Sequence, residues 1–186
     1  MDRKDNPDGH VLVSKLKSHM LFAEALRGIR SSILLAGETD ARRVMVITST
    51  TPGDGKTTFT TNFAITMASS GNRTLLVDGD LRRGNVHSYF GQPLENGLSE
   101  VLEGKIPLSA AIRETSEKGL FFLSAGSRPS NPSELLIGPK TREIIAKLRK
   151  DFDYVIFDSP PLTAIDDTFS IAAFSDGLMF LGSGLS

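Results

Sequence analysis

Residues 44–58 read Val-Met-Val-Ile-Thr-Ser-Thr-Thr-Pro-Gly-Asp-Gly-Lys-Thr-Thr, and this stretch decides the fold. Its first four residues are typical of a short buried strand, a loop follows at 50–57, and helical spacing begins at Thr58. Glycines in such a loop let successive backbone N–H groups point at an anion. The start of the helix adds its partial positive charge. Strand, glycine-containing loop and helix in this order therefore predict a phosphate-binding loop.

The loop carries the groups that a nucleotide needs. Lys56 can reach the β- and γ-phosphates, and the Thr57 hydroxyl can hold Mg²⁺. The loop departs from the pattern G-x-x-x-x-G-K-[ST] at Thr50, which stands where the first glycine is expected. The alternative is an ordinary strand-turn-helix with an accidental Gly-Lys-Thr. We predict a nucleotide site formed by Pro52, Gly53, Asp54, Gly55, Lys56, Thr57 and Thr58.

Length, charge and composition narrow the class of protein. A chain of 186 residues with 39% hydrophobic residues suits one globular domain, and a formal net charge of −1 argues against nucleic acid as a partner. The chain has no cysteine, which excludes disulfides and thiolate sites. No signal peptide is visible, and no apolar run approaches the ~20 residues of a membrane helix. We expect residues 1–13 to be a flexible lead-in to a domain at 14–186.

Short apolar runs alternate with stretches of helical spacing along the chain. Strands are expected at 44–47, 74–77, 120–123, 154–157 and 177–181. Helices are expected at 14–35, 58–70, 133–150 and 166–174. Nearly continuous apolar strands separated by helices indicate a parallel sheet covered on both faces. The predicted class is therefore α/β, a P-loop NTPase with a mostly parallel sheet flanked by helices on both faces.

The first predicted helix has two different faces. Its apolar stripe, at i, i+4, i+7 and i+11, consists of Phe22, Leu26, Ile29 and Ile33. The opposite arc carries Glu24, Arg27 and Arg30, whose three-residue spacing forms one charged surface strip. Such a strip is usually a solvated face.

Acidic residues follow two of the predicted strands, at the edge where ligands of open α/β sheets bind. Asp158 has the typical position of a metal-anchoring group, with a capping Asp as its alternative. Asp78 and Asp80 end another strand, where one acid can help to fix Mg²⁺ and the other can accept a proton from an attacking hydroxyl. Arg82 either steadies phosphate oxygens or pairs with a neighbouring acid.

Three segments resemble the Walker A, Walker A′ and Walker B motifs of bacterial tyrosine kinases. They are residues 50–57, Asp78-Gly79-Asp80-Leu81-Arg82 and Phe157-Asp158-Ser159-Pro160-Pro161. Glu24-Ala25-Leu26-Arg27-Gly28-Ile29-Arg30 is similar to the family's E-x-x-R-x-x-R motif, and Asn131-Pro132-Ser133-Glu134-Leu135-Leu136 is similar to a further family segment. The resemblance extends over about residues 20–182 with the motifs in the same order, which makes it specific.

The resemblance implies an ATP-dependent protein-tyrosine autokinase that regulates capsule and exopolysaccharide polymerisation and export. It places Lys56 on the phosphates and makes Asp78 the base that activates a tyrosine hydroxyl. By the same resemblance, Mg²⁺ is held by Thr57, Asp80 and Asp158. Ring-shaped self-association is implied for Glu24, Arg27 and Arg30.

The resemblance also implies a partner and a location. The partner is the cytoplasmic segment of a transmembrane polysaccharide co-polymerase, and the location is cytoplasmic, at the inner face of the membrane through that partner or a fused transmembrane region. The family has further C-terminal elements and a tyrosine-rich tail, and we expect this chain to lack both. Its only tyrosines are Tyr89, expected to be exposed, and Tyr154, expected in the core.

Two other interpretations remain open. Partition and septum-positioning ATPases share the fold, but they resemble K-G-G-x-G-K-[ST] at the loop, with a lysine that reaches across a dimer. Thr51 and Pro52 stand at the first two positions of that pattern here. A nucleotide-binding regulator without catalysis would carry the same site residues as a kinase.

Overall fold

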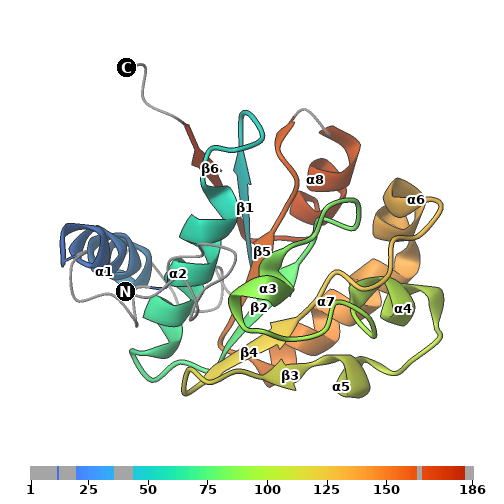
Figure 1. Cartoon of the computed structure of the whole chain (residues 1–186), viewed down its shortest axis with the longest axis horizontal. Coiled ribbons are helices and arrows are strands. Elements are labelled where there is room, and N and C mark those ends of the chain that lie inside the picture. Colours follow the sequence, from blue (N-terminus) through green and yellow to red (C-terminus); the bar gives the residue numbers. More distant parts are fainter. Residues whose placement is uncertain (1–11, 13–19, 36–43, 163–164, 183–186) are drawn as a thin grey trace.

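The structure is a computed structural model that describes residues 12, 20–35, 44–162 and 165–182. Six strands in this part form one sheet with the order β3-β4-β2-β5-β1-β6 (Figure 1). They are β1 Val44–Ser49, β2 Thr74–Asp78, β3 Arg113–Glu114, β4 Leu120–Leu123, β5 Tyr154–Asp158 and β6 Gly177–Leu181. Every neighbouring pair is parallel except β3 with β4. The mostly parallel α/β sheet is therefore confirmed.

Helices cover both faces of this sheet. They are α1 Met20–Leu35, α2 Lys56–Ala68, α3 Val86–Tyr89, α4 Leu98–Glu103, α5 Leu108–Ala111, α6 Pro132–Ile137, α7 Pro139–Asp151 and α8 Ile165–Ala172. Figure 1 shows α1 and α2 on one side of the strands and α4, α6, α7 and α8 on the other. Of the lead-in predicted at 1–13, only Leu12 is described, and it is buried at 5% exposure. Residues 14–19 of the first predicted helix lie outside the described part.

Two details differ from the prediction. The helix predicted at 133–150 is two helices, because Gly138 adopts an extended conformation (φ −58°, ψ 156°) and Pro139 starts a new helix without an N–H to continue the old one. The two-residue strand β3 was not predicted, since Arg113 and Glu114 carry no strand pattern of their own.

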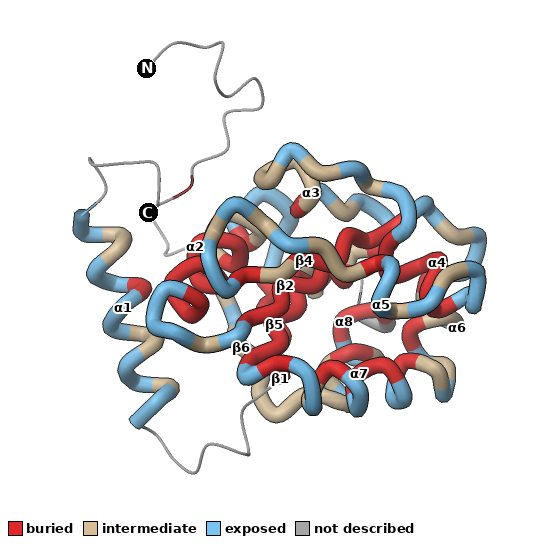
Figure 2. The backbone as a smooth tube through the Cα atoms, turned by 90° about the horizontal axis from the view of Figure 1, so that it is seen from below, coloured by how far each residue is buried: buried red, intermediate tan, exposed pale blue. Residues whose placement is uncertain are grey.

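Alternation along the strands divides the core into two clusters. Val44 and Val46 of β1 face the layer of α4, α6, α7 and α8, whereas Met45 and Ile47 face the layer of α1, α2 and α3. The tube in Figure 2 shows the strands buried between these layers and α1 largely exposed at the side of the molecule. Side chains of opposite faces thus enclose each central strand completely.

The apolar stripe of α1 packs as predicted. Leu26 is fully buried, and Phe22, Ile29 and Ile33 are partly buried against the cluster that contains α2. Because α1 rests on α2 rather than directly on the strands, its other faces remain open (Figure 2).

Glu100 fastens the loop after β4 to the start of α4. Its Oε2 accepts hydrogen bonds from the Gly97 amide (2.8 Å) and the Ser99 hydroxyl (3.0 Å), and its Oε1 accepts one from the Ser127 amide (2.9 Å). Burial alone would raise the pKa of this carboxyl, but the hydrogen bonds from Ser127 and Gly97 outweigh it and lower the pKa to about 2. The charged form of Glu100 therefore holds this corner together.

We predict that Glu100 makes the fold sensitive to acid. Because its pKa is lower in the folded chain than the ordinary 4.5, its contribution is complete above that pH and is lost as the pH falls towards about 2. Glu100→Gln should cost about 1–3 kcal/mol at pH 7 and flatten this acid dependence. Urea unfolding between pH 7 and pH 3 measures the free energy of unfolding of wild type and variant, with Glu143→Gln, at an exposed position, as control. Equal pH dependence in all three proteins would contradict the assignment.

Candidate nucleotide and phosphate site

The loop between β1 and α2 is stabilised by hydrogen bonds between its own residues. Gly53 and Gly55 have φ of +93° and +74°, a backbone region that residues with a Cβ rarely adopt. The Asp54 carboxylate accepts hydrogen bonds from the Thr51 amide and the Thr51 hydroxyl, both at 2.9 Å. Asn96 is the only non-glycine residue in the described segments with a positive φ, so Thr50 fits its position without needing to be glycine. This explains the departure from the phosphate-loop pattern.

A buried carboxylate at the end of β5 is bonded to the first two turns of α2. Asp158, at 2% exposure, accepts hydrogen bonds from three side chains of this helix. The donors are Lys56 Nζ (2.7 Å), Thr57 Oγ1 (2.8 Å) and Thr60 Oγ1 (3.0 Å). Lys56 is itself 9% exposed, so the pair is a buried salt bridge. The structure thus brings together three predicted site residues, and adds Thr60, which the sequence analysis missed.

Asp78 lies beside Asp158, since β2 and β5 pair these two residues in register. It is fully buried, and its two oxygens accept hydrogen bonds from the Asp80 amide (3.3 Å) and the Val86 amide (3.0 Å). Burial, and then the negative charge of Asp158, raise the pKa of the Asp78 carboxyl to about 8. This carboxyl therefore takes up or releases a proton close to neutral pH.

Asp80 is half-buried and organises the backbone that follows it. Its Oδ1 accepts hydrogen bonds from the Arg82 amide (3.1 Å) and the Arg83 amide (2.9 Å). The side chain of Arg82 turns to a neighbouring acid, Asp167, with Nε at 2.6 Å from Oδ2. Of the two roles considered for Arg82, the structure realises the ion pair.

Tyr89 differs from its expected exposure. Its side chain is half-buried, and its hydroxyl lies 2.7 Å from the Thr58 hydroxyl at the start of α2. Burial raises the pKa of this phenol. Tyr154 lies in β5 at 8% exposure, in the core as predicted. The contact of Tyr89 had no signal in the sequence, because α3 and α2 meet only through the fold.

The charged strip of α1 lies apart from this site. Glu24 and Arg27 are exposed, whereas Arg30 is half-buried and its Nη1 donates to the Thr66 carbonyl of α2 at 3.4 Å. Two members of the predicted strip therefore face solvent, and the third also holds α1 against α2.

The oxygen ligands that Mg²⁺ prefers are present at the sheet edge. The Thr57 hydroxyl touches the Asp158 carboxylate, and Asp80 follows the strand next to β5. No group of three or more His, Cys, Asp or Glu in the described part of the chain has the geometry of a metal cage. Mg²⁺ commonly takes only one or two protein oxygens together with water and phosphate, so these residues fit it.

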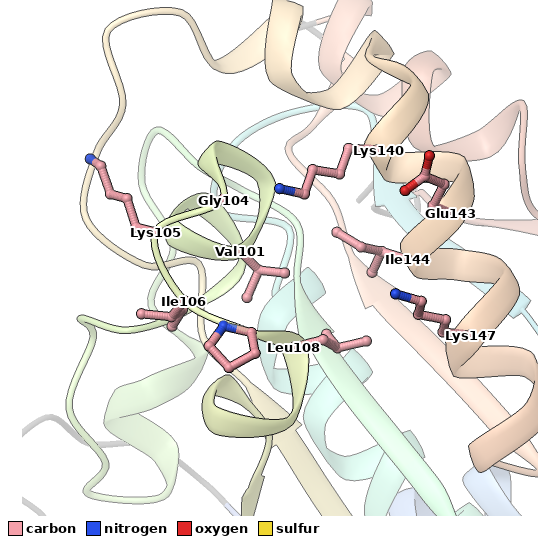
Figure 3. Close-up of a pocket in the computed structure, with 10 residues that line it drawn as sticks. Val101, Gly104, Lys105, Ile106, Leu108, Lys140, Glu143, Ile144 and Lys147 are labelled. Atoms are coloured by element: carbon pink, nitrogen blue, oxygen red, sulfur yellow. The ribbon is translucent and has the colours of Figure 1, made fainter.

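A hollow of about 380 Å³ lies between α4, α5 and α7 (Figure 3). Its rim carries Lys105, Lys140 and Lys147 above an apolar floor. Lys105 pairs with Glu103 at 2.6 Å, and Lys140 Nζ points at Gly104, where α4 ends. Lys105 and Lys140 thus lie against the end of α4, and the hollow shares no residue with the predicted nucleotide site.

Comparisons with known proteins agree with the geometry. The profile of a family described as the AAA domain matches residues 42–176. The chain is 34% identical over 174 residues to the tyrosine-protein kinase YwqD of Bacillus subtilis, covering 93% of this chain and 73% of YwqD. Its fold matches the kinase domain of the Escherichia coli tyrosine kinase ETK with a TM-score of 0.84 and 33% identity, covering 88% of this chain and 65% of that one. The chain belongs to the bacterial tyrosine kinase family.

Two further comparisons set limits on this assignment. The chain is 37% identical to the putative tyrosine-protein kinase EpsB of Ralstonia solanacearum over 158 residues, which are 85% of this chain but only 21% of EpsB. It thus spans about a fifth of the length of that relative. The septum site-determining protein MinD of Pyrococcus horikoshii is a more distant neighbour, with a TM-score of 0.63 and 26% identity over 75% of this chain and 57% of that one. MinD therefore shares the P-loop NTPase fold, and the tyrosine kinases are the nearer relatives.

In the described segments of this kinase-family chain, no helix combines the length and hydropathy needed to cross a bilayer.

Because Lys56 pairs with Asp158, we predict that Lys56→Met lowers both nucleotide affinity and the stability of the fold. The substitution should weaken nucleotide binding, because it removes a charge from the phosphate loop. It should also cost on the order of 3 kcal/mol of stability, because it leaves the Asp158 carboxylate buried without its cation. Adding Asp158→Asn should recover most of this stability but not the binding. Urea unfolding and titration with a fluorescent ADP measure both effects. An unfolding midpoint unchanged in the single variant would show that the ion pair contributes nothing.

Proposed function

We propose that this chain transfers the γ-phosphate of Mg–ATP to a tyrosine hydroxyl. The observation that carries the proposal is the cluster of Lys56, Thr57 and Asp158 at the phosphate loop, with Asp78 and Asp80 on the next strand. This arrangement supplies a cation, metal ligands and a proton acceptor within one sheet edge. Family membership supports the choice of tyrosine as acceptor.

In the proposed reaction the tyrosine oxygen forms a bond to the γ-phosphorus while the bond to the β-phosphate oxygen breaks, and ADP leaves. The tyrosine proton passes to Asp78, whose pKa of about 8 lies in the range that suits a general base near neutral pH. Lys56 stabilises charge on the phosphate oxygens. Thr57, Asp80 and Asp158 would hold Mg²⁺, which neutralises phosphate charge when bound.

The burial of Asp78 adds a requirement to this proposal. Both of its oxygens face backbone amides of residues 80 and 86. A tyrosine hydroxyl must come within about 3 Å of the base. The hydrogen bond from the Val86 amide to Asp78 Oδ2 therefore has to open before proton transfer.

The proposal is tested with a tyrosine-containing peptide, because Tyr154 is buried and Tyr89 is bonded to Thr58. Phosphotyrosine and free phosphate are measured in parallel after incubation with Mg–ATP. We expect phosphotyrosine on the peptide. Free phosphate alone would favour a partition-type ATPase, and neither product would favour a nucleotide-binding regulator.

Asp78→Asn and Asp158→Asn should fail in different ways. Asp78→Asn should keep Mg–ATP binding but lose transfer by about 100-fold or more, since only the proton acceptor is removed. Asp158→Asn should instead reduce the dependence of binding on Mg²⁺. Nucleotide titrations with and without Mg²⁺, beside the peptide assay, separate the two. Equal loss of nucleotide affinity in both variants would contradict the division of roles.

The self-association proposed for α1 rests on Glu24 and Arg27, which are exposed. A charged strip that meets a neighbour's acids makes a head-to-tail contact, which closes into a ring when the rotation allows. Polysaccharide export, a membrane co-polymerase as partner and a place at the inner membrane face belong to the same proposal, supported by the family.

Arg27→Ala should shift the chain towards monomers, because it removes an exposed positive charge from the strip. Light scattering across a concentration series measures this, with the exposed Arg128→Ala as control. Arg30→Ala is a poorer probe, since it also breaks the bond to the Thr66 carbonyl. If wild type and Arg27→Ala have the same mass, the charged strip of α1 is only a solvated face and takes no part in self-association.

A further inference from the structure

The Arg82 guanidinium is held by two side chains from distant elements. Asp167 of α8 accepts from Arg82 Nε at 2.6 Å and from Nη2 at 3.4 Å, and Ser133 of α6 accepts from Nη2 at 3.0 Å. The Ser133 hydroxyl in turn donates to Asp167 at 2.6 Å. Asp167 is 1% exposed, so this carboxylate has a fixed position in the core. The Arg82 guanidinium is therefore held by a carboxylate that is itself fixed in the core.

The backbone of the same residue is bound to Asp80. The amides of Arg82 and Arg83 both donate to Asp80 Oδ1. One residue thus connects the Asp80 carboxylate, through a backbone bond, with the buried Asp167 carboxylate, through its guanidinium. Because an arginine fork fixes direction as well as distance, the connection restrains how Asp80 is turned.

The beginning of this loop is bonded to β5 and lies close to α8. The Gly79 amide donates to the Asp158 carbonyl at 2.7 Å, and a Cβ at Gly79 would lie 2.9 Å from Ile171 Cδ1. Gly79, which lies close to α8, and Arg82, which is bonded to α8, therefore lie on either side of Asp80.

We propose that Asp167, supported by Ser133, is a positioning residue that sets the orientation of Asp80 through Arg82. The inference rests on the proposed role of Asp80 as a Mg²⁺ ligand. Partners that hold a metal ligand from outside commonly change metal affinity by 10- to 100-fold when they are removed. Asp167 touches neither nucleotide nor metal in this proposal, and it acts only through Arg82.

The competing explanation is that the bonds among Arg82, Ser133 and Asp167 only hold α6 and α8 together. Such a purely structural connection contributes to stability but leaves the coupling between metal binding and nucleotide binding unchanged. That coupling is the ratio of the ADP dissociation constant in EDTA to the constant in saturating Mg²⁺. A loss of stability alone moves neither constant in the folded protein.

The experiment measures this ratio with a fluorescent ADP for Arg82→Gln, Asp167→Asn, Ser133→Ala and the double variant Arg82→Gln/Asp167→Asn. Asp80→Asn sets the effect of losing the ligand itself. Arg149→Gln is the matched control, because it breaks another two-point arginine pair, with Asp176 at 2.5 and 2.7 Å, between α7 and the start of β6.

We expect Arg82→Gln and Asp167→Asn each to lower the ratio about tenfold, and Ser133→Ala to lower it less. The double variant should be no worse than either single one, because both residues act through one connection. Arg149→Gln should leave the ratio unchanged. An unchanged ratio for Asp167→Asn beside a lowered one for Asp80→Asn overturns the inference, as does additivity in the double variant.

Hydrogen exchange of residues 80–84 decides the matter independently of Mg²⁺. Asp167→Asn should speed exchange at the Arg82 and Arg83 amides, whereas Arg149→Gln should not. If Asp80→Asn leaves the ratio unchanged, the metal role of Asp80 is wrong. In that case unchanged exchange in Asp167→Asn also overturns the positioning role, and faster exchange supports it.

Discussion

The site depends on one buried charge, the Asp158 carboxylate. A carboxylate with so little exposure needs hydrogen-bond donors, and it finds them on two consecutive turns of α2, at Lys56, Thr57 and Thr60. Just beyond Asp158, the Ser159 amide and hydroxyl bond to the Ile47 carbonyl of β1. The end of β5 is therefore fixed to both the strand before the phosphate loop and the helix after it. The loop between them has to close its turn with glycines of positive φ.

The same edge concentrates negative charge in a way that opposes stability. Asp78 and Asp158 sit opposite each other on paired strands, and the pKa of Asp78 rises to about 8 as a result of burial and of this neighbour. A group whose pKa is raised on folding contributes less stability as the pH climbs from its ordinary range through that value. Lys56 offsets part of this repulsion, because its charge lowers the pKa of Asp78. Ligands that bring positive charge to this edge would relieve the repulsion, so the energetic penalty and the proposed activity have one origin.

The sequence predicted those parts of the site that follow from local order. The phosphate loop was predictable because strand, glycines and helix start are consecutive, and the approach of Asp78 to Asp158 because parallel strands end at one edge. The partner of Arg82 was not, because Asp167 lies 85 positions along the chain and only packing brings α8 to the loop after β2. The contact between Tyr89 and Thr58 was not predictable either, because only packing brings α3 to α2. Residues 138–139 carried a local signal for the helix break, but the apolar spacing across them outweighed it.

The position of α1 connects the proposed assembly surface with the phosphate site. Leu26 is buried in the cluster that contains α2, and Arg30 reaches the Thr66 carbonyl in the last turns of that helix. The first residue of α2 is Lys56, on the phosphate loop. A contact on the exposed face of α1 would thus press on a helix whose other end carries Lys56 and Thr57. Because α2 is nearly all buried and its first two turns are bonded to Asp158, bending this helix would disturb packed contacts along its length. Coupling between assembly and nucleotide binding would therefore need a movement of α2 as a whole, and the Asp158 hydrogen bonds are the contacts that such a movement has to change.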